Sequence, residues 1–190
     1  MANESSSEKA ALQMYVNDMH ALQKHILEAV EHQYADERVK ADAPTYDLIG
    51  KIKSTLTHQV NDLQGEINRL GSGGVMATAK AAVSTALGAF AGLYDKVRKD
   101  PVSRMLRDNY TALNMASFSY TQLHTTALAY RDQPAAKVAL QHLQDLTPLI
   151  IHLNEVVPHV VVKELQDDGP IDTSVAPTAV SNTQHAWKPA

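Results

Sequence analysis

Residues 48–74, LIGKIKSTLTHQVNDLQGEINRLGSGG, decide the fold. Apolar side chains recur in this stretch at steps of three and four residues, from Ile49 to Leu70. That period places them on one face of an α-helix. Gly71, followed by Ser72 and two more glycines, is a typical helix stop. The stretch therefore predicts a long amphipathic helix whose apolar face must be covered by other helices.

The same period runs upstream of this helix. Ser5 and Glu8 fit a capping box, and apolar residues behind them predict a helix over residues 6–34. The segment that ends in Pro44 separates the two helices, because the residue before proline disfavours helical backbone. The two helices are expected to form a hairpin.

Downstream, the pattern predicts helices over 102–130 and 134–166. Pro148 and Pro158 fall inside the second of them, so we expect that helix to bend or split where backbone hydrogen bonds are lost. No strand pattern of useful length occurs, and the fold class is all-α.

Residues 75–99 predict a further helix that is rich in alanine and glycine. Ser84, Gly88 and Gly92 lie four residues apart, which gives a ridge along which another helix can approach closely. This helix would occupy the connection between the two hairpins. The prediction is therefore a ferritin-like antiparallel four-helix bundle with an extra Ala/Gly-rich helix in that connection.

Composition narrows the function classes. The 190 residues contain no cysteine, so a metal site would need histidine and carboxylate ligands, and nine histidines are available. A net charge of −4 without a basic cluster argues against binding nucleic acid. The N-terminal sequence lacks the features of a signal peptide, and the apolar run 81–94 is too short to span a membrane. We expect a cytoplasmic protein without membrane contact.

The chain divides into a helical domain over 1–166 and a tail over 167–190. Helical periodicity stops after Gln166, and the polar, proline-containing tail is expected to be flexible. Trp187, the single tryptophan, could anchor a protein partner through this tail. It could equally have no function.

The expected buried face of helix 102–130 is unusually polar. It carries Asn109, Tyr110, Ser117, Tyr120 and His124. Buried polar groups must be hydrogen-bonded, so this face indicates either a pocket or metal site, or a structural network. Gln23 faces inward on the first helix and could take part. The outer face of helix 102–130 also carries Met115 and Phe118, which a second subunit could cover.

One further set of side chains has the spacing of metal ligands. His152, Glu155 and His159 share a stripe of the last helix, although a solvated polar face explains them equally well. No HExxH, GxSxG or nucleotide-binding glycine motif occurs, and no nucleophile can be paired with a base. Whether the protein is an enzyme stays open.

Several short segments resemble the YciE/YciF-type ferritin-like family. They are Met14-Tyr15-Val16-Asn17-Asp18, Glu66-Ile67-Asn68-Arg69-Leu70 and the position of Tyr120, and the resemblance spans residues 12–165. The resemblance implies a bacterial stress-associated four-helix bundle that often holds two metal ions. It places Asp18 at the ligand position of the first helix, and Asp62 or Glu66 at that of the second.

The chain departs from this family pattern in the second hairpin. Where the family has Glu-His-Tyr-Glu, this chain has Phe118-Ser119-Tyr120-Thr121, and the acidic pair of the last helix is reduced to Gln144-Asp145. Both carboxylates of the third main helix are thereby lost. His124 could replace one of them as a nitrogen ligand.

Two hypotheses follow for the function. The first is a stress-associated protein that binds iron or another divalent metal at a remodelled centre of Asp18, Asp62, Glu66 and His124. The second is a metal-free bundle that acts in assembly or partner binding. A homo-oligomer is expected under either hypothesis.

Overall fold

The computed structural model describes residues 2–71 and 101–188, and places side chains from Lys9 onward. This part of the chain is helical and contains no strand. The elements are α1 (Ala2–Ala35), α2 (Glu37–Lys40), α3 (Ala43–Leu70), α5 (Val102–Ala129), α6 (Gln133–Asp168) and α7 (Val175–Ala186). The all-α prediction is confirmed. The helix expected over 75–99 lies outside the described residues.

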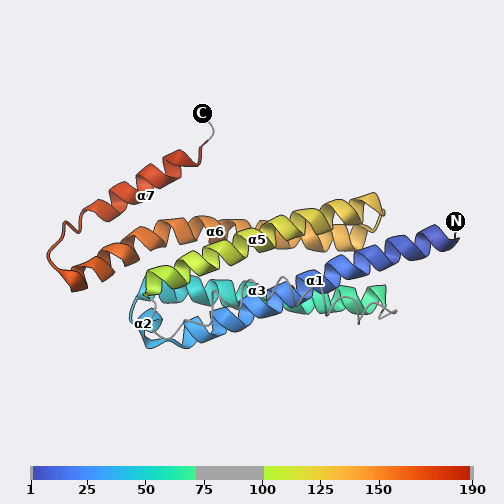
Figure 1. Ribbon diagram of the computed structural model, residues 1–190, viewed down its shortest axis with the longest axis horizontal. Coiled ribbons are helices and arrows are strands. Elements are labelled where there is room, and N and C mark those ends of the chain that lie inside the picture. The colour runs from blue at the N-terminus through green and yellow to red at the C-terminus, as the bar shows by residue number, and fades with distance from the viewer. Residues whose placement is uncertain (1, 72–100, 189–190) are drawn as a thin grey trace.

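Four long helices form the bundle. α1 packs on α3 and on α5, and α6 packs on the same two helices. In Figure 1, α3 and α5 run from left to right, whereas α1 and α6 run from right to left. Each of the four packed pairs is therefore antiparallel. The end of α3 and the start of α5 lie at opposite ends of the bundle, as Figure 1 shows.

The core is built from the apolar stripe of each helix. One turn of helix contributes about one buried large side chain, because side chains three or four residues apart face the same way. The fully buried side chains include Val16, Ile26, Val30, Leu48, Ile52, Leu56, Leu63, Leu106, Leu113, Leu123, Leu146 and Leu153. These stripes leave room at the centre for a few polar side chains.

Local signals start and stop the helices as the sequence indicates. The Asp42 carboxylate accepts hydrogen bonds from the backbone N–H and the hydroxyl of Thr45, which caps the start of α3. Gly71 ends α3 at φ 85°, a backbone conformation that glycine adopts without strain. Asp132 caps α6 by accepting from the backbone N–H of Ala135.

α6 continues through both of its prolines. Of the two outcomes expected at Pro148 and Pro158, a bend or a split, the split does not occur, because the helix extends without a break from Gln133 to Asp168. Pro148 is exposed, as is Gln144, the residue one turn earlier whose carbonyl loses its helical partner. Water can therefore satisfy that carbonyl, which lowers the cost of keeping the proline inside the helix.

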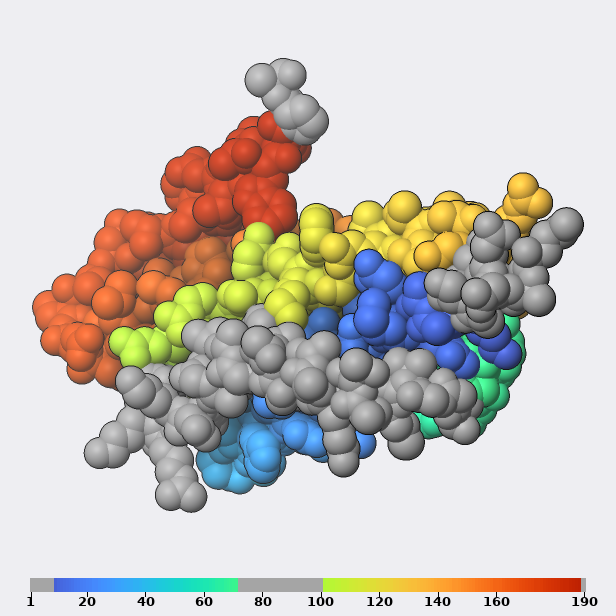
Figure 2. All heavy atoms as spheres, turned by 45° about the vertical axis from the view of Figure 1, so that its right-hand side comes forward, coloured from blue at the N-terminus to red at the C-terminus, as the bar shows by residue number. Residues whose placement is uncertain are grey.

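The tail also needs correction, because part of it is helical. α7 occupies Val175–Ala186 and packs on α6, with Ala176 buried. The Gln184 amide donates to the Glu155 carboxylate, and the Trp187 ring meets Tyr110 of α5 edge-on at 5.9 Å between centroids. Figure 2 shows the atoms of α7 (red) against the bundle.

The N-terminus of α5 is capped from another helix. The Glu164 carboxylate of α6 accepts hydrogen bonds from the backbone N–H and the hydroxyl of Ser103. Carboxylates are favourable at a helix N-terminus, where backbone N–H groups lack helical partners.

We expect Glu164→Gln to lower the free energy of unfolding by about 1 kcal/mol, because the charge at the helix terminus is lost. Urea denaturation of the two proteins measures this difference. Glu31→Gln on the exposed side of α1 is the matched control and should change stability little. Equal losses in the two variants would contradict the capping role.

Candidate functional site

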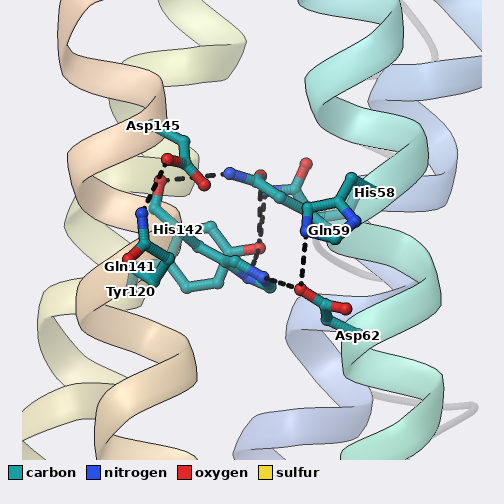
Figure 3. A network of polar contacts seen from close by, with 8 residues as sticks. His58, Gln59, Asp62, Tyr120, Gln141, His142 and Asp145 are labelled. Carbon is teal, nitrogen blue, oxygen red and sulfur yellow. Dashed lines mark hydrogen bonds and ion pairs between the residues drawn. The ribbon is translucent and has the colours of Figure 1, made fainter.

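A network of polar side chains occupies the centre of the bundle. Each long helix contributes one member: Gln23 from α1, Gln59 from α3, Tyr120 from α5 and His142 from α6, all fully buried. They lie on the buried stripes of their helices, between apolar layers. We call these four residues, together with Asp62, the central network; Figure 3 shows its arrangement around Tyr120 and His142.

The hydrogen bonds of the central network have defined directions. The amide nitrogen of Gln23 donates to the Tyr120 hydroxyl oxygen at 3.0 Å and to Oε1 of Gln59 at 3.1 Å. The amide of Gln59 donates in turn to the backbone carbonyl of His142 at 3.1 Å. α1, α3, α5 and α6 are thereby joined through side chains within one layer.

His142 links this layer to the surface. Its Nε2 lies 3.1 Å from Oδ2 of Asp62, and its Nδ1 lies 3.0 Å from the Tyr120 hydroxyl. A carboxylate only accepts, so Nε2 carries the hydrogen and Nδ1 of the neutral ring accepts from Tyr120. Asp62 is about one-third exposed and also contacts His58. The line Asp62, His142, Tyr120 therefore runs from the edge of the bundle to its centre.

Burial sets the protonation states of this line. It raises the pKa of Tyr120 well above its usual value, because the phenolate would lose its hydration. Burial also lowers the pKa of His142, against the opposing effect of its hydrogen bond to Asp62. Tyr120 and His142 are thus held neutral near pH 7, with Asp62 at the exposed end.

The structure places the four predicted metal ligands in separate surroundings. Asp62 belongs to the central network. Glu66 is almost buried and accepts from Arg69, which also reaches Asp132 at 2.7 Å. Nδ1 of His124 lies 2.8 Å from the carbonyl of Ala136.

Asp18, the fourth predicted ligand, is half-buried on α1. Its Oδ1 makes no hydrogen bond to the described residues, and burial raises its pKa. Within residues 9–71 and 101–188, no three histidine or carboxylate side chains gather so that they could hold a metal ion. His152, Glu155 and His159 therefore do not form a metal site either. The Glu155 carboxylate instead accepts a hydrogen bond from Gln184 of α7.

Sequence reasoning named Gln23, Asp62 and Tyr120 of the central network and missed His142. The inward orientation of Gln23 and Tyr120 is confirmed. His142 was missed, although it follows buried Ala139 by three residues and precedes buried Leu146 by four. That spacing puts it on the core face of α6 and is the signal that could have revealed it.

Comparison of the chain with family models, with curated proteins and with solved structures finds no match. In the described ranges, no helix combines the length and the apolar character that a membrane span requires.

Proposed function

We propose that this chain is a ferritin-like bundle that acts by binding a partner at its surface, while its centre serves to hold the helices together. The observation that carries the proposal is the central network, in which one buried side chain per helix is hydrogen-bonded to the others. Donors and acceptors that are engaged with one another are not free to bind a ligand; within this layer, Oε1 of Gln23 makes no hydrogen bond to the described residues.

Two features support the ferritin-like part of the proposal. The first is the connectivity. α3 and α5 run in the same direction, and the helices within each hairpin, α1 with α3 and α5 with α6, are antiparallel (Figure 1). The second is the spacing of the central side chains. Di-metal proteins of this fold use one carboxylate from each of two helices and an i, i+3 pair from each of the others.

This chain repeats that layout with different residues. α1 and α5 contribute Gln23 and Tyr120, and an i, i+3 pair stands on α3 (Gln59, Asp62). On α6, Asp145 follows His142 by three residues. Two carboxylates do not fit a carboxylate-bridged pair of metal ions, which draws acidic ligands from all four helices. The donor set fits a hydrogen-bonded core better.

Binding of a single divalent cation is the second candidate function. The contact of 3.1 Å between Nε2 of His142 and Oδ2 of Asp62 favours it, because imidazole and carboxylate are both ligands for such ions. It would replace the hydrogen of Nε2 by the cation.

Metal loading distinguishes the two functions. We expect untagged protein incubated with Fe(II), Mn(II) or Zn(II) and then dialysed to retain far less than one metal ion per chain in elemental analysis. The His142→Gln variant should retain the same small amount. Near-stoichiometric metal in the wild type that is lost in this variant would overturn the proposal in favour of the cation site.

A further inference from the structure

A groove opens at the end of the bundle where α2, the start of α5 and the end of α6 meet. Its volume is about 720 Å³. Apolar side chains from two helices form part of its wall, among them Val102, Val161 and Leu165. Leu165 is 46% exposed and Val161 is 37% exposed. The wall therefore offers apolar surface that a partner could cover.

Some of the charged side chains around this groove have a partner, and others do not. Lys163 contacts Asp42 at 3.1 Å, and Glu164 caps α5 through Ser103. Asp167 and Asp168 also line the groove, and neither makes a hydrogen bond or ion pair with any described residue. Arg38 and Lys163 also line the groove, and each is paired with another carboxylate, Arg38 with Asp36 and Lys163 with Asp42. Asp167 and Asp168 are therefore carboxylates of the groove that no ion pair among the described residues neutralises.

Asp167 and Asp168 lie at the C-terminal end of a helix, which makes the electrostatic potential at the groove more negative. Asp167 and Asp168 are the last residues of α6, where the unpaired carbonyls of the helix already concentrate negative charge. Acidic residues at this end are unfavourable for the helix, and cations are favourable. A basic ligand would offset the unfavourable interaction of Asp167 and Asp168 with the C-terminal end of the helix.

We propose that this groove binds a partner peptide in which apolar side chains are flanked by lysine or arginine. The apolar side chains would cover Val161 and Leu165, and the cations would pair with Asp167 and Asp168. The inference rests on the proposed function, since it names the chemistry of the partner. Charge complementarity selects a basic segment over an acidic one.

Fluorescence anisotropy of a short fluorescein-labelled peptide with leucines flanked by lysines tests the proposal on the full chain. We expect saturable binding that weakens as salt is added. The Asp167→Asn/Asp168→Asn variant should bind about fivefold more weakly at low salt, because exposed ion pairs contribute modestly. Leu165→Asn should also weaken binding about fivefold, through lost apolar contact and with less dependence on salt.

The controls separate a groove from general attraction between charges. Glu28→Gln/Glu31→Gln removes the same charge from exposed positions of α1 that do not line the groove, and should leave the affinity unchanged. A peptide with glutamates in place of the lysines should not bind. Absence of saturable binding, or equal weakening in both double variants, would overturn the groove. Stoichiometric metal retention would overturn the proposed function and would leave the peptide result intact.

Discussion

Tyr120→Phe is expected to lower the free energy of unfolding by about 2 kcal/mol, although it removes a single oxygen atom. The hydroxyl donates to Nδ1 of His142 and accepts from the amide of Gln23, and all three residues are fully buried. Each buried polar group left without a partner costs about 1–3 kcal/mol. Urea denaturation with a two-state fit gives the difference.

Tyr110→Phe is the matched control for this variant. Tyr110 lies on the same helix, is half-buried, and its hydroxyl forms no hydrogen bond within the described part of the chain. Its replacement should change stability by less than about 0.5 kcal/mol. If both variants lose the same free energy, the central network does not hold the bundle together in the way described.

Stability is also expected to fall as the pH is lowered below about 6.5, the ordinary pKa of histidine. Burial lowers the pKa of His142 in the folded protein, so the unfolded chain binds a proton first. The contribution of neutral His142 is thus present above the unfolded pKa and lost as the pH falls toward the folded pKa. The loss is at most about 1.4 kcal/mol per pH unit and levels off below the folded pKa.

His142→Gln isolates this effect. Glutamine can still donate to Asp62 but does not titrate, so the variant should show a flatter dependence of stability on pH. Asp18 acts in the opposite sense, because burial raises its pKa and stability then gains as it is protonated. That contribution is common to both proteins and cancels in their difference. Parallel stability curves for wild type and variant would refute the assignment to His142.

The helices of the described chain could be predicted from sequence because their signals are local. The stripe from Ile49 to Leu70 and the stop at Gly71 depend on residues that are close along the chain. The sequence did not reveal that α6 stays unbroken at Pro148, because a proline costs less where the freed carbonyl faces water, and exposure is a property of the folded molecule.

The central network and α7 depend on contacts that spacing does not determine. Helical spacing gives the face on which Gln23 or Tyr120 lies, but it does not say that His142 of another helix will meet the hydroxyl. α7 is short and uncharged, so its own propensity is weak, and packing on α6 supplies what the local sequence lacks. The Glu164 cap is likewise a contact between distant residues.

A layer of hydrogen bonds at the middle of an apolar core also controls how the four helices slide and rotate. Leucine-rich faces can pack in several offsets, because one apolar contact replaces another at little cost. Gln23, Gln59, Tyr120 and His142 meet in one alignment, and a shift of one helix by a single turn would strand buried donors and acceptors. The polar layer therefore favours a single register of the four helices relative to one another.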